Sequence, residues 1–177
     1  MDFLDIKEFL KDTLKYIVLI VVVLFTVIYV VTLEQVIGPS MSPTLNNGDV
    51  VLLNKFIYKF SDIKRGEIVS LNYSDTKFLI KRVIGLPGEY VEIKDNQVYI
   101  GDKILNEYYL DNAKMSNFSL NDLGFNVIPK DMYLVLGDNR ENSMDSRDLK
   151  VGLIRKNDII GRVRVRLWPL NKIGIVK

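Results

Sequence analysis

Gly38-Pro39-Ser40-Met41-Ser42-Pro43-Thr44-Leu45 separates two parts of the chain that differ in composition. Before it lies a long aliphatic run without charge, and after it short runs rich in Val, Ile and Tyr alternate with turn residues. A long uncharged run is typical of a membrane helix, and the later pattern is typical of β-strands. The sequence therefore predicts one helix followed by one β-rich domain.

The apolar run covers residues 17–33, and Tyr16 extends it by one position. A helix over 16–33 rises about 1.5 Å per residue and so measures about 27 Å, close to the bilayer hydrocarbon thickness of about 30 Å. A buried core helix and a cleavable signal peptide are the alternatives. The run exits through Glu34-Gln35-Val36-Ile37, which is not a small-residue cleavage site. We therefore expect a transmembrane helix over 16–33 that stays attached.

Residues 1–15 precede this span and carry apolar side chains at a helical spacing. They form either an amphipathic lead-in to the span or a short tail without stable structure. Lys7, Lys11 and Lys15 lie before the span, and the positive-inside rule places such a segment in the cytoplasm. We expect a single-pass protein of the cell membrane, in contact with the lipid bilayer, whose residues 34–177 form an extracytoplasmic catalytic domain.

The domain after the span shows the pattern of an antiparallel β fold. Turn signals such as Asn46-Asn47-Gly48 and Asp95-Asn96 separate short apolar runs, and the second of them predicts a hairpin. The polar, irregular residues 106–126 predict a surface excursion. The fold class is therefore mainly β, with folded-over antiparallel sheets. The predicted strands cover residues 49–55, 67–73, 78–84, 90–94, 97–100, 132–136 and 161–167.

Composition limits the partners and the kinds of site. The chain has 177 residues and a net charge of only +2, which does not suggest a nucleic-acid partner. It contains no cysteine and no histidine, so disulfides are excluded and a zinc site is improbable. We expect no metal and no cofactor.

Near the C-terminus, residues 162–168 alternate arginine with apolar side chains, so the arginines share one strand face. This face is either solvated or a basic stripe that contacts anionic lipid headgroups.

Ser40 is a candidate nucleophile, although a serine hydroxyl needs a neighbouring base to take its proton. Without histidine, the chain cannot form a Ser-His-Asp triad, and a lysine, a carboxylate or another chain must supply the base. By itself the stretch is also compatible with a simple loop, and Ser42 is a competing serine.

Lys81 is the candidate base because it lies in the apolar run Phe78–Ile84. Burial would lower the pKa of a lysine from about 10.4 toward neutral pH. Lys81 and Arg82 point to opposite faces of a strand, so one can be buried while the other stays in water. The alternative is a lysine whose stem is packed while its amine reaches water.

Three segments together resemble the conserved boxes of bacterial type I signal peptidases, which are membrane-bound serine/lysine proteases. The third segment follows the apolar residues Tyr133–Leu136 and reads as a strand running into a polar turn. The resemblance extends over roughly residues 15–170, and Arg65–Val69 is similar to a fourth, weaker box. The three boxes match Ser40–Leu45 (S-M-x-P-T-L), Lys81–Glu89 (K-R-x-x-G-x-P-G-[DE]) and Gly137–Arg147 (G-D-N-R-x-x-S-x-D-S-R).

The resemblance implies a role for each residue of the site. Ser40 would be the nucleophile and Lys81 the general base, which must reach the Ser40 hydroxyl as a neutral amine. Ser143 would orient Lys81 by accepting from its amine, with turn capping as the alternative role. The oxyanion would bind the Ser40 backbone N–H. Relatives can add a hydroxyl two residues before the nucleophile, where this chain has Gly38, so the second donor near Gly38 stays open.

The segment Gly137–Arg147 also contains residues that would hold the loop of the site in place. Asp145 and Arg147 are two positions apart and predict an ion pair that braces the loop carrying Ser143, with help from Arg140. Direct participation in the chemistry is the alternative for this pair.

The implied substrate is the end of a signal peptide, bound as an added strand with small side chains at the first and third positions before the cut. The implied enzyme is a serine endopeptidase that removes signal peptides from secreted preproteins through an acyl-enzyme, beside the secretion translocon. Alternatives are a Ser/Lys processing protease dedicated to one substrate, a self-cleaving repressor-type protease, and a catalytically silent, membrane-tethered peptide-binding β domain. The predicted substrate-binding residues are Val36, Ile37, Gly38, Pro39, Leu79 and Ile80.

Overall fold

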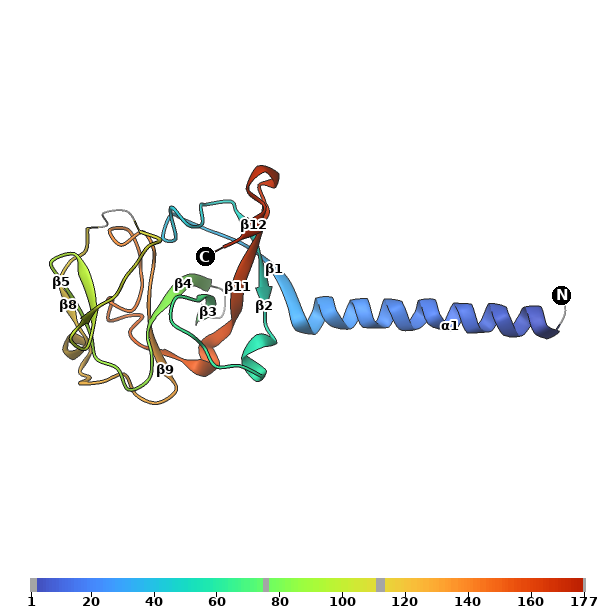
Figure 1. Cartoon of the computed structure of the whole chain (residues 1–177), viewed down its shortest axis with the longest axis horizontal. Coiled ribbons are helices and arrows are strands. Elements are labelled where there is room, and N and C mark those ends of the chain that lie inside the picture. Colours follow the sequence, from blue (N-terminus) through green and yellow to red (C-terminus); the bar gives the residue numbers. More distant parts are fainter. Residues whose placement is uncertain (1–2, 75–76, 111–113, 177) are drawn as a thin grey trace.

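The computed structural model describes residues 3–74, 77–110 and 114–176 as one long helix and a β-rich domain (Figure 1). The helix α1 spans Phe3–Phe25 and continues through a π-helical turn at Thr26–Val30. The strands are β1 Val31–Gln35, β2 Val50–Asn54, β3 Ile68–Ser74, β4 Lys77–Gly85, β5 Val91–Lys94, β6 Gln97–Ile100, β7 Lys103–Ile104, β8 Phe118–Ser119, β9 Met132–Leu136, β10 Ile154–Arg155, β11 Ile159–Trp168 and β12 Gly174–Ile175. Short 3-10 turns cover Ile57–Lys59, Leu120–Leu123, Lys156–Asp158 and Leu170–Lys172.

The strands of the described ranges form two sheets. The larger sheet has the order β1-β2-β11-β3-β4-β9-β10, with β12 paired to β11, and the smaller has the order β7-β6-β5-β8. Each of these strand pairs is antiparallel. The predicted mainly β fold of antiparallel sheets is therefore confirmed.

The longer predicted strands match β2, β3, β4, β5, β6, β9 and β11 to within about two residues, the usual uncertainty of strand ends. The predicted hairpin at Asp95-Asn96 joins β5 to β6, and both turn residues have positive φ, 52° and 60°, as a type I′ turn requires. Sequence patterns did not predict β7, β8, β10 or β12, because a strand of two residues shows no alternation. They also missed β1, because its first three residues continue the apolar run that was expected to be helical.

Residues 106–126 differ from the surface excursion predicted for them. Phe118 and Leu120 are 7% and 0% exposed and pack in one core cluster with Ile84, Val91 and Leu134. The expectation is wrong for these two residues, since β8 pairs with β5 of the smaller sheet and brings Phe118 and the following 3-10 turn, which begins at Leu120, against the core.

The helix projects from the domain (Figure 1). Apolar side chains along it, such as Phe9, Ile20 and Phe25, are exposed. Within the described residues, Ile6–Val30 is the one helix long and apolar enough to cross a membrane, with a mean hydropathy of 2.5. This helix begins ten residues before the expected 16–33 span and ends three residues before the end of that span. Val31 and Leu33 are extended instead, because they pair with Asn54 and Leu52 of β2.

Lys55 joins the end of this helix to the domain. Its backbone N–H donates to the Val30 carbonyl at 2.9 Å, and its Nζ donates to the Ile28 carbonyl at 2.8 Å. Carbonyls at a helix C-terminus lack partners within the helix and carry partial negative charge, so an ammonium is a favourable partner. The helix therefore leads into β1 through a hydrogen-bonded junction.

The three arginines near the C-terminus lie on β11. Arg162 pairs with Glu67 at 2.7 Å and Arg166 with Asp49 at 3.0 Å, whereas Arg164 is exposed. Two of the three charges are thus balanced inside the domain, which favours the strand-face interpretation over a basic stripe against lipid.

Apolar packing fixes the loop that carries Ser40. Met41 and Leu45 are both fully buried, in a cluster that includes Val51 of β2 and Ile80 of β4. Burying side chains of this size stabilises each by about 1.5–3 kcal/mol relative to exposure. The loop is therefore anchored immediately beside Ser40 while Ser40 itself stays partly accessible.

Candidate active site

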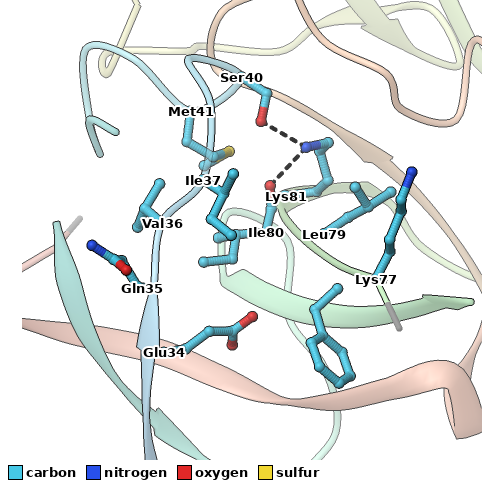
Figure 2. A pocket seen from close by; sticks show the side chains of 11 residues that line it. Glu34, Gln35, Val36, Ile37, Ser40, Met41, Lys77, Leu79, Ile80 and Lys81 are labelled. Atoms are coloured by element: carbon cyan, nitrogen blue, oxygen red, sulfur yellow. Dashed lines mark hydrogen bonds between the residues drawn. The ribbon is translucent and has the colours of Figure 1, made fainter. Parts of the chain in front are cut away.

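Ser40 and Lys81 meet in the structure, as Figure 2 shows. Ser40 follows β1 in its loop, and Lys81 lies on β4 with 1% of its surface exposed. The Lys81 Nζ donates to the Ser40 Oγ at 2.8 Å and to the Ile80 carbonyl at 2.9 Å. This distance permits direct proton transfer between hydroxyl and amine.

Burial lowers the pKa of Lys81 from 10.5 to about 8, because an ammonium loses hydration in the apolar interior. The charges of Asp145 and Asp138 act in the opposite direction and raise the pKa, but less strongly. A substantial fraction of the amine is therefore neutral at weakly alkaline pH, so Lys81 can accept a proton there.

Arg82 is also buried, at 1% exposure, so the expectation that one of the pair would stay in water is wrong. Its Nε and Nη2 donate to the two carboxylate oxygens of Asp138 at 2.8 and 2.6 Å, and its guanidinium lies 3.8 Å from the Tyr109 ring centroid. A bidentate partner and an aromatic face offset the loss of water around the guanidinium. Both faces of β4 are therefore covered at this point.

The loop after β9 is held by Asp145, which is fully buried. Arg147 donates from Nε and Nη2 to its carboxylate, both at 2.8 Å, and the Gly137 backbone N–H donates at 3.0 Å. Burial raises the pKa of Asp145, but the hydrogen bonds and charge of Arg147 outweigh it, and the pKa lies below its usual range. The Asn139 N–H donates to the Ser40 carbonyl at 3.0 Å, so this loop also fixes the backbone of Ser40.

Arg140 connects the loop after β9 to the segment before β8. Its Nε donates to the Gly137 carbonyl at 2.9 Å, and its Nη1 donates to Glu107 at 2.9 Å. Sequence reasoning missed Glu107, since nothing in its local pattern points to a partner thirty-three positions away. The ion pair shows that a segment expected at the surface helps to hold the loop.

Ser143 lies against Gly137 and makes no hydrogen bond to Lys81. A Cβ at Gly137 would stand 2.1 Å from Ser143 Oγ and 2.4 Å from the Ser40 carbonyl oxygen, so only glycine permits this approach. The second acceptor of Lys81 is the Ile80 carbonyl, and the buried Ser143 hydroxyl instead helps to lower the pKa of Asp145. The orienting role of Ser143 stays a prediction.

The backbone N–H of Ser40 meets no acceptor among residues 3–74, 77–110 and 114–176. The Gly38 N–H, in contrast, donates to Asn47 Oδ1 at 2.8 Å, and Gly38 takes a left-handed conformation with φ of 84°. A developing oxyanion can therefore use the Ser40 N–H but not the Gly38 N–H in this arrangement.

A groove of about 380 Å³ opens beside the pair (Figure 2). Four predicted substrate-binding residues line it, namely Val36, Ile37, Leu79 and Ile80, whereas the predicted Gly38 and Pro39 do not. Sequence reasoning missed Glu34, although it shares a strand face with Val36 at a spacing of two. The complete lining is Glu34, Gln35, Val36, Ile37, Ser40, Met41, Lys77, Phe78, Leu79, Ile80 and Lys81.

Comparison with known proteins gives a consistent picture. A family model described as signal peptidase, peptidase S26, matches residues 9–168. Signal peptidase I P of Bacillus subtilis subsp. natto is 39% identical over 97% of this chain and 96% of its own length. Signal peptidase IB of Staphylococcus aureus strain N315 is 37% identical over 94% of this chain and 93% of its own length. The crystal structure of a signal peptidase I from Enterococcus faecalis V583 is 31% identical, covers 58% of this chain and 97% of that one, and has a TM-score of 0.51.

Proposed function

The chain belongs to the signal peptidases of the peptidase S26 family, and on this premise we propose that Ser40 and Lys81 form its catalytic dyad. Membership in this family makes the chain a peptidase that acts on preproteins bearing signal peptides. The observation that carries the proposal is the 2.8 Å contact between Lys81 Nζ and Ser40 Oγ, made by a lysine that is 1% exposed. A pKa near 8 for Lys81 supports the role of general base.

In the proposed reaction, the neutral amine of Lys81 accepts the hydroxyl proton as Ser40 Oγ attacks the scissile carbonyl carbon. A C–O bond forms, and the carbonyl electron pair moves onto oxygen, where the Ser40 N–H donates to it. The C–N bond then breaks, and the leaving amine takes the proton from the Lys81 ammonium. Water attacks the resulting ester with Lys81 again as base, which releases the carboxylate product and restores the Ser40 hydroxyl.

Two free strand edges support binding of the substrate as an extended strand. β3 pairs with β4 along its length, but β9 pairs with β4 only from Arg82 onward, so within the described residues Lys77–Lys81 keep one unpaired edge. β1 pairs with β2 and is terminal in the larger sheet. Both edges border the groove, and a peptide inserted between them can hydrogen-bond to either backbone.

We propose cleavage after small residues, with A-x-A-like sites as the preferred class. The walls near Ser40 are formed by Met41, Ile37 and Ile80, bulky side chains that leave little room for a large residue next to the cut. The helix Ile6–Val30 supports anchoring in the bilayer with the N-terminus inside, the domain outside and the site beside the secretion translocon, where preproteins emerge.

The test is cleavage of a purified preprotein by the detergent-solubilised full chain and by three variants. Ser40→Ala and Lys81→Ala should each lose at least about a thousandfold in kcat/KM, the scale seen when one member of a nucleophile–base pair is removed. Ser42→Ala is the matched control and should retain activity, because Ser42 Oγ bonds to Asn46 Oδ1 at 3.2 Å, outside the groove lining.

Substantial cleavage by Ser40→Ala or Lys81→Ala would refute the dyad. An inactive wild type would instead favour a dedicated processing enzyme or a peptide-binding domain.

A further inference from the structure

Asn139, in the loop after β9, binds the two consecutive backbone carbonyls at Ser40. Its side-chain Nδ2 donates to the Pro39 carbonyl at 3.2 Å, and its backbone N–H donates to the Ser40 carbonyl at 3.0 Å. Its Oδ1 accepts from the Asn142 N–H at 3.3 Å. A flipped amide would set an acceptor against a carbonyl oxygen and a donor against an N–H, so these contacts fix which atom is Nδ2.

Asn139 is itself held in place by its two neighbours in the chain. Asp138 is 2% exposed and accepts from Arg82 with both of its carboxylate oxygens. Arg140 is 3% exposed and donates to Glu107. Because buried, charged contacts fix the backbone on both sides of Asn139, its side chain presents Nδ2 to Pro39 from a rigid support.

The contact with Pro39 has a consequence for the Ser40 N–H. The Pro39 carbonyl and the Ser40 N–H belong to one planar, trans peptide unit, so the two groups point in opposite directions. Holding the carbonyl toward the loop after β9 therefore turns the N–H away from that loop. Among the residues that the structure describes, this N–H meets no acceptor, so it is available to a developing oxyanion.

A second donor, the Ser42 N–H, also reaches the Pro39 carbonyl, at 3.0 Å. It belongs to the same loop as Ser40 and moves with it, whereas Asn139 lies one hundred positions further along the chain. A carbonyl oxygen can accept two hydrogen bonds, and donors from two separate segments together define the direction of the peptide plane. The Asn139 contact thus ties this plane to the buried loop after β9.

We propose that Asn139 is a positioning residue that orients the Ser40 N–H toward the oxyanion of the transition state. It touches no reacting atom and acts through the Pro39–Ser40 peptide unit. The inference rests on the proposed function, because an oxyanion forms at this N–H only if Ser40 is the nucleophile. It gives the loop after β9 a part in stabilising the transition state.

Loss of the Asn139 side chain should lower kcat and leave KM within about twofold, since the oxyanion exists in the transition state and not in the bound substrate. Removing an oxyanion donor outright costs about 100- to 1000-fold in kcat. Removing one of the two groups that orient such a donor should cost less, about tenfold. In Asn139→Ala the rise of activity through the pKa of Lys81, near 8, should stay where it is in the wild type.

The test is preprotein cleavage by the detergent-solubilised full chain from about pH 6 to about pH 10, for the wild type, Asn139→Ala and Asn139→Asp. Asn139→Asp keeps the size and the Oδ1 acceptor but offers no donor to Pro39, so its kcat should also fall about tenfold. Comparison on the alkaline plateau removes any shift that the added carboxylate causes in the pKa of Lys81. Asn142→Ala is the matched control, because this exposed residue of the same loop binds Asn139 through its backbone N–H and should keep its kcat.

Inhibition by a peptide aldehyde gives an independent readout. Ser40 Oγ adds to the aldehyde carbon, its proton passes to Lys81, and the aldehyde oxygen takes the negative charge that the Ser40 N–H would bind. Asn139→Ala should weaken this inhibition about tenfold. The corresponding peptide alcohol forms no such adduct and should bind the variant as it binds the wild type.

Wild-type kcat in Asn139→Ala would overturn the inference, and so would a loss that appears only as a higher KM or as a shifted pH midpoint. A fall in kcat that merely matches a loss of folded protein, measured by thermal unfolding of both Asn139 variants, would overturn it too. These results leave the proposed function standing, because the wild type still cuts the preprotein. A wild type that cuts no preprotein would refute the proposed function and this inference together.

Discussion

Lys81 meets two opposed requirements at the scale of a single residue. Its proposed role as a base needs a neutral amine, which burial on β4 favours, but the same burial makes the protonated form costly. Two contacts limit that cost, one to Ser40 and one to the Ile80 carbonyl. The proposed base is therefore expected to destabilise the fold at neutral pH.

Replacing Lys81 should show this destabilisation. Its pKa is about 8 in the fold and 10.5 when free, so the folded state binds fewer protons between these values and its stability rises with pH across that window. Below about pH 8 the full penalty applies. Lys81→Met should therefore raise the free energy of unfolding near pH 7 by about 1–3 kcal/mol, and the gain should shrink toward pH 10.5.

Urea unfolding of the detergent-solubilised chain at the two pH values measures this difference. Lys130→Met, at an exposed position, is the control and should change stability little at either pH. A gain for Lys81→Met that does not depend on pH would show that packing, and not the buried charge, is responsible.

Asp145 allows a second prediction at this scale. Asp145→Asn removes the charge that faces a largely buried Arg147 and should destabilise the chain by about 3–5 kcal/mol. Asp158→Asn is the matched control, because its partner Arg155 is 69% exposed, and it should cost less than about 1 kcal/mol. Thermal unfolding of both variants measures the contrast, and equal shifts would contradict a bracing role for Asp145.

At the scale of elements, the site forms where three segments converge: the loop after β1, the strand β4 and the loop after β9. Gly137 permits the closest of these approaches, because both Ser143 and the Ser40 carbonyl lie against its Cα, where a side chain would stand. The unpaired edge of β4 faces the groove because β9 begins its pairing only at Arg82. Sheet register thus decides both where a substrate can add and where Lys81 lies.

Gly137→Ala tests this convergence. The added methyl would overlap Ser143 Oγ and the Ser40 carbonyl oxygen, so one segment must move, and displacement of a catalytic group by about 1 Å can cost about a hundredfold in rate. We expect a loss of that order in kcat with a stability loss of about 1–3 kcal/mol. Gly174→Ala is the matched control, since nothing lies within 4 Å of its added methyl. Wild-type kcat in Gly137→Ala would contradict the tight approach.

The longer strands could be predicted from the sequence, because the alternation of apolar residues and the turn residues between them are local signals. The contact between Ser40 and Lys81 could be predicted because both residues belong to boxes that resemble those of one family. The burial of Arg82 could not be predicted, since it depends on Asp138 and Tyr109, which the fold brings to it. Glu107 and the contacts of Ser143 depend in the same way on loop packing. Strands as short as β8 and β10 arise from pairing and carry no periodic signal.

At the scale of the whole molecule, the chain joins an apolar helix to a β domain through Lys55 and β1. The expected start of the domain at 34 would divide β1, which begins at Val31. The helix is followed within ten residues by Ser40, so the site is expected to work close to the membrane surface.

The proposed orientation can be tested by labelling, because the chain contains no cysteine and a single substitution gives a unique site. Lys130→Cys, in the domain, should react with a membrane-impermeant maleimide in intact cells stripped of their wall. Lys7→Cys should react only after the membrane is permeabilised. The reverse pattern would contradict an N-terminus inside, and labelling of both in intact cells would contradict a single span.

If a buried, neutral Lys81 activates Ser40, as we propose, the pH dependence of kcat/KM reveals it most directly. Preprotein cleavage by the wild type, measured from about pH 6 to about pH 10, should rise through one ionisation near 8, because the amine must lose its proton to act as base. Lys81→Ala should abolish this rise together with the activity. A profile that stays flat, or one that rises only near the pKa of 10.5 of a free lysine, would contradict activation of Ser40 by a buried Lys81.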